Sequence, residues 1–299
     1  MGANLIGRYF SHNLNPTRAA GAVILAAFVW TAFAAPGAAR SHRHEQSERP
    51  LSAESVNTAV FAGPVSRRGT NAVVLKAQVL LDRLGFSPGA IDGRSEENFA
   101  KALAGFQQTQ SLPATGKLDA DTWQKLVGND DVPALVDYEI RDADVKGPFT
   151  PHIPARMEEM SGLEHLDYTG PVELLAEKFH VAESLLRALN RGRPLDRAGT
   201  VIVVPNVRDA RSGDAVARVE VDKTHKAVRA FAADGTLVAF YPATIGSREK
   251  PAPSGTFRIL NVTRNPTYHY DPKFHFKGVK AATVHHPAGA QQSGRAGLD

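Results

Sequence analysis

The fold of the first module is decided by residues 71–93, which read NAVVLKAQVLLDRLGFSPGAIDG. Apolar residues recur in this stretch at intervals of four, three and four, a spacing that predicts one face of a helix. These positions are Val73, Ala77, Leu80 and Leu84. Gly85 comes next and predicts a left-handed helix stop, and the Gly- and Pro-containing segment 86–93 predicts a turn.

Two shorter helices are expected after this turn. Ser95 is suited to cap a helix that runs to about Gln110. Asp119 is suited to cap a third helix that buries Trp123 and Leu126. The pattern therefore predicts a unit of three helices.

The order and spacing of these features resemble the peptidoglycan-binding domain found beside many cell-wall enzymes. The residues that carry the resemblance are Leu80, Leu84, Gly85, Phe86, Ile91, Asp92, Gly93, Ala102, Leu103, Phe106, Gln107, Leu112, Pro113, Thr115, Gly116, Leu118 and Asp119. The resemblance implies a peptidoglycan-binding-like helical domain over 70–128. It implies candidate peptidoglycan-binding residues at Asp92, Gly93, Phe106, Gln107 and Gly116. The alternative is a three-helix structural unit in which Asp92 and Gly93 only form the turn.

Composition bounds the class of protein. The chain has 299 residues, of which 42% are hydrophobic and 22% are charged, so it is too polar for a polytopic membrane protein. The net charge is +4. Residues 1–50 hold five arginines and two glutamates, so most of this net charge lies in them. The rest of the chain is close to neutral, so we expect no nucleic-acid partner. Cysteine is absent, which excludes disulfides and thiolate catalysis by this chain.

The N-terminal residues predict export. Arg8 and Arg18 precede an uncharged run of sixteen residues, 19–34, that ends in small side chains. This pattern is typical of a secretory signal, whereas an uncleaved membrane anchor would need about 20 residues. We expect a signal peptide over 1–34, no stable membrane span after its cleavage, and a location in the periplasm or cell wall. Residues 35–69 are polar and are predicted to be a disordered linker.

The middle of the chain predicts a connector and then a small mixed unit. Residues 129–162 are rich in Asp and Pro, which predicts little regular structure. Two apolar runs on either side of His180 predict short helices, and Val201–Pro205 predicts a strand.

Leu189-Asn190 and Val203-Val204-Pro205 match the pattern of a lysin-motif domain, and residues 163–207 are similar to that family. The resemblance implies a strand–helix–helix–strand unit that binds glycan chains. The residues from Gly170 to Leu174 depart from the usual Gly-Asp-Thr-Leu, so a generic spacer is the alternative.

Alternating segments predict a β-meander in the last third of the chain. Its strands are expected over 216–222, 227–232 and 237–241, with Asp234-Gly235 in a tight turn. The segments that follow, Thr244–Ser247 and Pro251–Phe257 among them, make the series resemble the opening of an L,D-transpeptidase domain. The matching motif residues are Gly246, Pro253, Ser254, Gly255 and Phe257.

The resemblance implies an all-β sandwich that cross-links peptidoglycan stem peptides by acyl transfer. In that family the nucleophile is the cysteine of a Ser-His-Gly-Cys-x-Arg motif, which this chain lacks. Without the attacking sulfur there is no covalent catalysis, and no base is evident beside Ser254. We predict an inactive chain with no catalytic residue, no cofactor and no metal site, although His269, His275, His285 and His286 lie near one another in sequence.

The sequence as a whole predicts a multidomain α+β protein: a three-helix peptidoglycan-binding domain, a small lysin-motif-like unit, and an incomplete all-β L,D-transpeptidase sandwich. The last is interpreted as the N-terminal part of the catalytic domain, residues 215–299, truncated. Plausible codons for 291–299 spell the family's next segment in another frame, so we hypothesise a frameshift between about Thr283 and Gln291. The truncated meander is expected to leave an unpaired edge and an uncovered apolar face. The expected partner is peptidoglycan, and a non-catalytic wall-binding or scaffold protein is the alternative function.

Overall fold

The computed structural model describes residues 51–66, 68–128, 132–154, 157–160, 163, 165–207, 215–246, 251–262, 268–270 and 284–286. The expected signal peptide, the first part of the expected linker and the tail over 291–299 lie outside the described residues.

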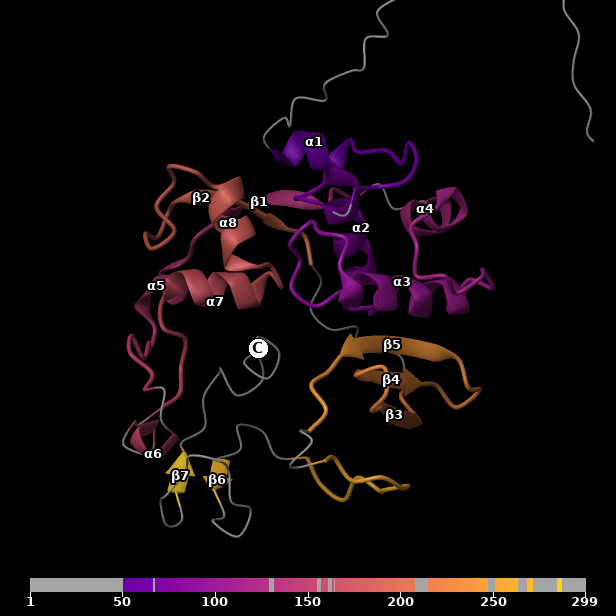
Figure 1. Ribbon diagram of the computed structural model, residues 1–299. Helices are drawn as coiled ribbons and strands as arrows, with labels where there is room; N and C mark the ends of the chain where they lie inside the picture. Colours follow the sequence, from indigo (N-terminus) through magenta and orange to yellow (C-terminus); the bar gives the residue numbers. More distant parts are fainter. Residues whose placement is uncertain are drawn as a thin grey trace, which may run out of the picture. The chain divides into compact units, whose positions relative to one another are not determined.

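Four helices form the region from 51 to 128 (Figure 1). They are α1 (Ala53–Asn57), α2 (Ala72–Arg83), α3 (Glu97–Thr109) and α4 (Ala120–Val127). Asn71 caps α2, because its side-chain oxygen accepts hydrogen bonds from the Val73 and Val74 amides at 2.8 and 3.2 Å. Gly85 has a φ of +84° at the end of α2, which confirms the predicted stop. Asp119 caps α4 as predicted, accepting from the Thr122 amide at 2.8 Å.

Local predictions in this region fail at three points. Ser95 is not the cap of α3, since Glu96 occupies that position and its side chain makes no capping hydrogen bond. Trp123 is half-buried rather than buried. At α1 the sequence predicts a linker, but the structure has a helix. A capping box between Ser52 and Ser55 and the complete burial of Val56 stabilise that single turn.

An antiparallel pair of strands frames the middle of the chain. Strand β1 (Leu135–Glu139) pairs with β2 (Val201–Pro205), with Leu135 opposite Pro205. The helices between them are α5 (Asp142–Lys146), α6 (Met157–Met160), α7 (Pro171–Lys178) and α8 (Glu183–Leu189). We call the part from 135 to 205 the strand–helix–helix–strand unit after β1, α7, α8 and β2.

Strand β1 lies within the segment for which the sequence predicts little regular structure. Its exposed carboxylates Asp137 and Glu139 alternate with the half-buried Val136 and Tyr138. Only one face of the strand is apolar, and its partner lies more than sixty residues away in sequence. Because of these two features, the local sequence pattern does not predict this strand.

The predicted meander is present. Strands β3 (Arg218–Asp222), β4 (Ala227–Phe231) and β5 (Leu237–Pro242) form an antiparallel sheet in that order. Strands β6 (Tyr268–Tyr270) and β7 (Val284–His286) pair with each other. The described strands do not close into a barrel, and the whole is the mixed helix-and-sheet protein that the sequence predicts.

Helix α2 contributes to two hydrophobic cores. Leu75 and Val79 pack in one core with Ile91 and with buried residues of the strand–helix–helix–strand unit: Leu135, Ile140, Leu175, Leu186 and Ile202. From the other side of the helix, four residues pack in a second core with α3, α4 and the meander: Val74, Ala77, Leu80 and Leu81. The meander contributes Ala227, Leu237 and Phe240 to this core. The parts expected as separate modules therefore share their cores.

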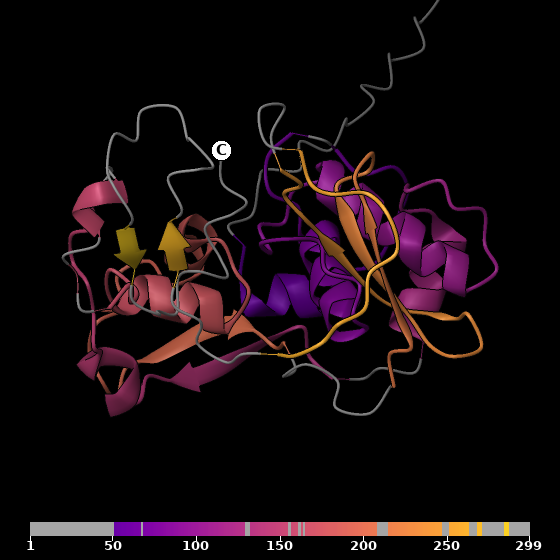
Figure 2. The same cartoon turned by 90° about the horizontal axis from the view of Figure 1, so that it is seen from below.

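Backbone hydrogen bonds extend the meander beyond β5. The Phe240 amide donates to the Gly85 carbonyl and the Ser87 amide donates to the Phe240 carbonyl, both at 2.9 Å. Helix α3 lies along β5 (Figures 1 and 2) and covers the face that carries Phe240. The expected unpaired edge and uncovered face are thus occupied at β5, because residues 85–87 and α3 supply the missing neighbours. The opposite face stays exposed at Val219, Val221 and Tyr241.

Candidate functional site

Two of the candidate peptidoglycan-binding residues are in the interior. The exposed fractions of Phe106 and Gln107 are 2% and 0%. Gln107 Nε2 donates to the Lys117 carbonyl and to Thr122 Oγ1, each at 2.9 Å, and Oε1 accepts from the Gly116 amide at 2.9 Å. Phe106 packs edge-to-face on Phe86. Gln107 therefore holds the loop after α3 in place, Phe106 packs in the hydrophobic core, and neither side chain is presented to a ligand.

Asp92 and Gly93 form a turn that a buried glutamine clamps. Gln78 Oε1 accepts from the Gly93 amide at 2.6 Å, and its Nε2 donates to Asp92 Oδ1 at 2.9 Å. Gly93 has a φ of +73°, and a Cβ there would collide with Thr70. The turn-forming alternative thus accounts for both residues. Sequence reasoning missed Gln78, although a lone glutamine on an apolar helix face was a usable signal.

The backbone conformation and the close packing at Gly116 also favour glycine. Its φ is +65°, and an added Cβ would lie 2.7 Å from the Ala100 carbonyl oxygen. Of the five candidate residues, Asp92 and Gly116 alone keep part of their surface accessible.

The motif residues after the meander are exposed and do not converge. Gly246, Pro253, Gly255 and Phe257 lie at the surface, and Phe257 exposes 71% of its area. Ser254 has a neighbour that the sequence did not reveal, because Lys223 Nζ lies 2.6 Å from its Oγ. The same ammonium donates to the Ala252 carbonyl at 3.0 Å. Lys223 Nζ therefore links Ser254 to the Ala252 carbonyl, and these contacts tie the loop down.

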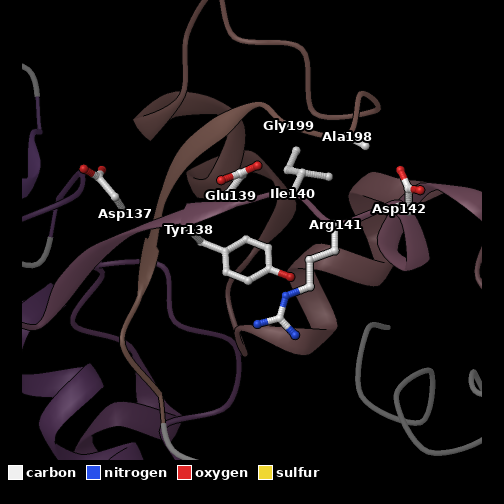
Figure 3. Close-up of a pocket in the computed structure, with 8 residues that line it drawn as sticks. All are labelled: Asp137, Tyr138, Glu139, Ile140, Arg141, Asp142, Ala198 and Gly199. Atoms are coloured by element: carbon white, nitrogen blue, oxygen red, sulfur yellow. The ribbon is translucent and has the colours of Figure 1, made fainter.

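A polar pocket lies at the end of β1 (Figure 3). Its volume is about 460 Å³, and it is lined by Asp137, Tyr138, Glu139, Ile140, Arg141, Asp142, Ala198 and Gly199. Backbone hydrogen bonds bring the two lining segments together: the Ile140 amide donates to Thr200 and the Gly199 amide donates to Ile140, at 2.9 and 2.8 Å. The pocket therefore exists only because β1 and β2 pair.

The side chains of the pocket divide into two sets. Figure 3 shows the Tyr138 ring and the Arg141 guanidinium on one side of β1, with the Asp137 and Glu139 carboxylates directed away from them. The alternation of side chains along β1 separates Tyr138 from Asp137 and Glu139, whereas Arg141 follows the strand as the N-cap residue of α5. The Arg141 guanidinium carbon lies 5.7 Å from the centre of the Tyr138 ring, within cation–π range.

A buried carboxylate fixes Tyr138. The Tyr138 hydroxyl donates to Asp144 Oδ2 at 2.6 Å, and Lys178 Nζ donates to Asp144 Oδ1 at 2.7 Å. The Arg141 amide also donates to Asp144 Oδ2, at 2.9 Å. Burial acts to raise the pKa of Asp144, but the hydrogen bonds from Lys178, Tyr138 and Arg141 outweigh it, so this pKa lies below its ordinary value.

The same network limits what Tyr138 can do. Lys178 Nζ lies 4.7 Å from the centre of the Tyr138 ring, and Phe179 packs edge-to-face on that ring with centroids 4.8 Å apart. With Arg141 also close to it, the ring is used within the protein rather than offered as a stacking platform. Recognition in this pocket must therefore come from hydrogen bonds.

The pocket supplies three exposed carboxylates and one guanidinium. Asp137 and Glu139 can accept hydrogen bonds from hydroxyl and amide groups and Arg141 can donate them, whereas Asp142 already accepts one from Lys146 Nζ at 2.9 Å. The surplus of negative charge disfavours an anionic ligand. Among the described residues no cluster of His, Asp and Glu is arranged to hold a metal ion. This chemistry suits an uncharged, hydroxyl-rich ligand.

Two family models match the chain. Residues 70–126 match the peptidoglycan binding domain, and residues 217–293 match the L,D-transpeptidase catalytic domain. We call these two parts the peptidoglycan-binding domain and the L,D-transpeptidase region, after the family models that they match. Both resemblances predicted from the sequence are confirmed, whereas the lysin-motif resemblance stays a prediction. No curated protein matches the chain.

The L,D-transpeptidase region also carries an aspartate–histidine pair, in the turn after β3. His225 Nδ1 lies 2.7 Å from Asp222 Oδ2, and hydrogen bonds from His225 lower the pKa of Asp222 to about 2. Arg229 Nη1 also lies 3.1 Å from Asp222 Oδ2, so this carboxylate contacts both His225 and Arg229. The pair closes a surface turn of the L,D-transpeptidase region.

No helix in the described part of the chain has the length and apolar character needed to cross a membrane.

Proposed function

We propose that this protein is an exported cell-wall protein of the L,D-transpeptidase family that binds peptidoglycan and does not itself cross-link it. The observation that carries the proposal is the conjunction of a peptidoglycan-binding domain with a transpeptidase region in a chain that contains no cysteine. Acyl transfer in the family needs a thiolate that attacks the stem peptide. We expect no replacement by Ser254, because Lys223 Nζ is shared between its hydroxyl and the Ala252 carbonyl.

The polar pocket at the end of β1 supports the binding half of the proposal. Peptidoglycan strands are chains of N-acetylated sugars, rich in hydroxyl and amide groups. Asp137 and Glu139 are exposed at the mouth of the pocket and can accept hydrogen bonds from such groups. The wall contact is therefore assigned to this pocket, in addition to the surface of the peptidoglycan-binding domain.

Co-sedimentation with purified sacculi tests the binding. We expect the wild-type chain to pellet with sacculi, and the double variant Asp137→Asn, Glu139→Gln to bind several-fold more weakly. Glu54→Gln, an exposed change on α1 outside both the pocket and residues 70–126, is the control and should bind like wild type. A wild-type chain that stays in the supernatant would refute peptidoglycan binding.

Mass spectrometry tests the absence of catalysis. The purified chain is incubated with tetrapeptide muropeptides, and we expect neither a covalent adduct nor cross-linked product. An acyl adduct on Ser254 would show that the lysine beside it does act as a base, and this half of the proposal would fail.

A scaffold protein that reaches the wall only through a partner is the alternative. The exposed apolar face at Val219, Val221 and Tyr241 is the observation that favours it. The same sedimentation assay, with no other protein present, separates the two functions, because such a scaffold would not pellet alone.

A further inference from the structure

A second cleft lies on the strand–helix–helix–strand unit. Its volume is about 330 Å³, and it is lined by Val172, Arg187, Asn190, Arg191, Gly192, Arg193, Leu195 and Asp196. Leu195 is buried and Val172 half-buried, and both belong to the first core, so they form an apolar floor. The rim is formed by three arginines from the end of α8 and the loop that follows it.

The three arginines keep donors available. Arg193 Nη1 donates to the Val201 carbonyl at 2.7 Å, which leaves its other guanidinium hydrogens unused by that bond. Arg187 Nη2 lies 3.5 Å from Glu183, and both side chains are about half exposed, so the pair is weak. Arg191 is exposed and, within the described residues, has no hydrogen bond or ion pair.

A buried asparagine holds this loop in position. Asn190 Nδ2 donates to the Leu186 and Val203 carbonyls at 2.9 and 2.8 Å, and its Oδ1 accepts from the Val203 amide at 2.7 Å. These bonds fasten the residue next to Arg191 to both α8 and β2. The arginines are therefore carried by a loop whose base is fixed before any ligand binds.

The two pockets of the unit have opposite charge. Three carboxylates and one guanidinium line the pocket at the end of β1, whereas three guanidiniums and a single carboxylate, Asp196, line this cleft. An anion repelled by the first pocket is attracted by the second. Guanidinium groups bind carboxylates through two parallel hydrogen bonds, and the apolar floor suits short aliphatic side chains.

We propose that this arginine cleft binds the carboxylate groups of peptidoglycan stem peptides. The proposal rests on the peptidoglycan binding proposed above and divides the work between two sites. The acidic pocket takes the glycan strand, and the arginine cleft takes the peptide attached to it.

The test compares sacculi with and without their stem peptides. Wild-type chain is expected to bind intact sacculi more tightly than sacculi stripped of peptides by an amidase, and added salt should remove the difference. The double variant Arg187→Gln, Arg191→Gln should lose about tenfold in affinity for intact sacculi and bind stripped sacculi like wild type. Arg197→Gln removes the same charge per residue from the same loop but lies outside the cleft lining, so it should bind both like wild type.

The outcomes separate the two proposals. Equal binding of wild type to intact and stripped sacculi would overturn the arginine cleft and leave glycan binding standing. Failure to bind either would overturn the proposed function itself. Competition with N-acetyl-alanyl-glutamate and with inorganic phosphate identifies the anion: displacement by the dipeptide at the lower concentration supports the inference, and displacement by phosphate at the lower concentration refutes it.

Discussion

The shared core between the peptidoglycan-binding domain and the transpeptidase meander makes a sharp prediction about Phe240. This side chain is 3% exposed and lies in the core formed with α2, α3 and α4. Its ring carbon Cγ would be 3.6 Å from a Cβ placed on Gly105, so α3 approaches it closely. Replacing a buried Phe by Ala costs about 3–5 kcal/mol when the site cannot collapse. We expect Phe240→Ala to lower the unfolding free energy by about 4 kcal/mol and Tm by roughly 10 °C.

The neighbouring tyrosine is the matched control. Tyr241 is in the same strand, exposes 47% of its area and faces away from α3. Tyr241→Ala should therefore cost about 1 kcal/mol or less.

Urea unfolding followed by Trp123 fluorescence is the assay. Trp123 lies on α4, in the peptidoglycan-binding domain, and Trp30→Phe removes the other tryptophan of the chain. If the two parts share a core, a change in the meander moves the transition reported by Trp123. An unchanged Trp123 transition in Phe240→Ala would refute the shared core.

Three further changes test the internal contacts. Gln78→Ala leaves the Asp92 and Gly93 amides unsatisfied and should cost about 3 kcal/mol in urea unfolding, whereas Gln108→Ala at an exposed position of α3 should have little effect. Gly116→Ala forces a side chain into a left-handed conformation against Ala100 and should cost roughly 2 kcal/mol; a neutral result would contradict the contact. The pKa of Asp144 is lowered in the folded protein, so its contribution is full above the ordinary value near ~3.9 and is lost as the pH falls through the lowered value. Thermal melts between pH 7 and pH 2 should therefore lose less stability in Asp144→Asn than in wild type, and parallel curves would count against the network.

Local signals predicted the helices and the meander well. The apolar spacing from Val73 to Leu84, the stop at Gly85 and the cap at Asp119 all act within a few residues, so the sequence displays them directly. The turn at Asp234-Gly235 likewise joins strands that are neighbours in sequence.

The burial and the partners of individual side chains were harder to predict from local sequence pattern. Gln107 and Phe106 belong to the motif that identifies the domain, yet both are buried. Whether a polar residue faces solvent or satisfies loop amides depends on where Lys117 and Thr122 come to lie. Lys223, which contacts Ser254, lies 31 residues away in sequence, so no local sequence pattern predicts this contact.

Taken alone, the amino-acid sequence determined the two family resemblances and the lack of any thiol, because these depend only on which residues occur and in what order. Tertiary structure decided that β1 pairs with β2, that α2 serves two cores, and that acidic and basic pockets form on one unit. The physical reason is distance along the chain. Caps and periodicity are settled by contacts within one or two turns, whereas pairing and burial depend on segments brought together only when the whole chain excludes water from its apolar surface.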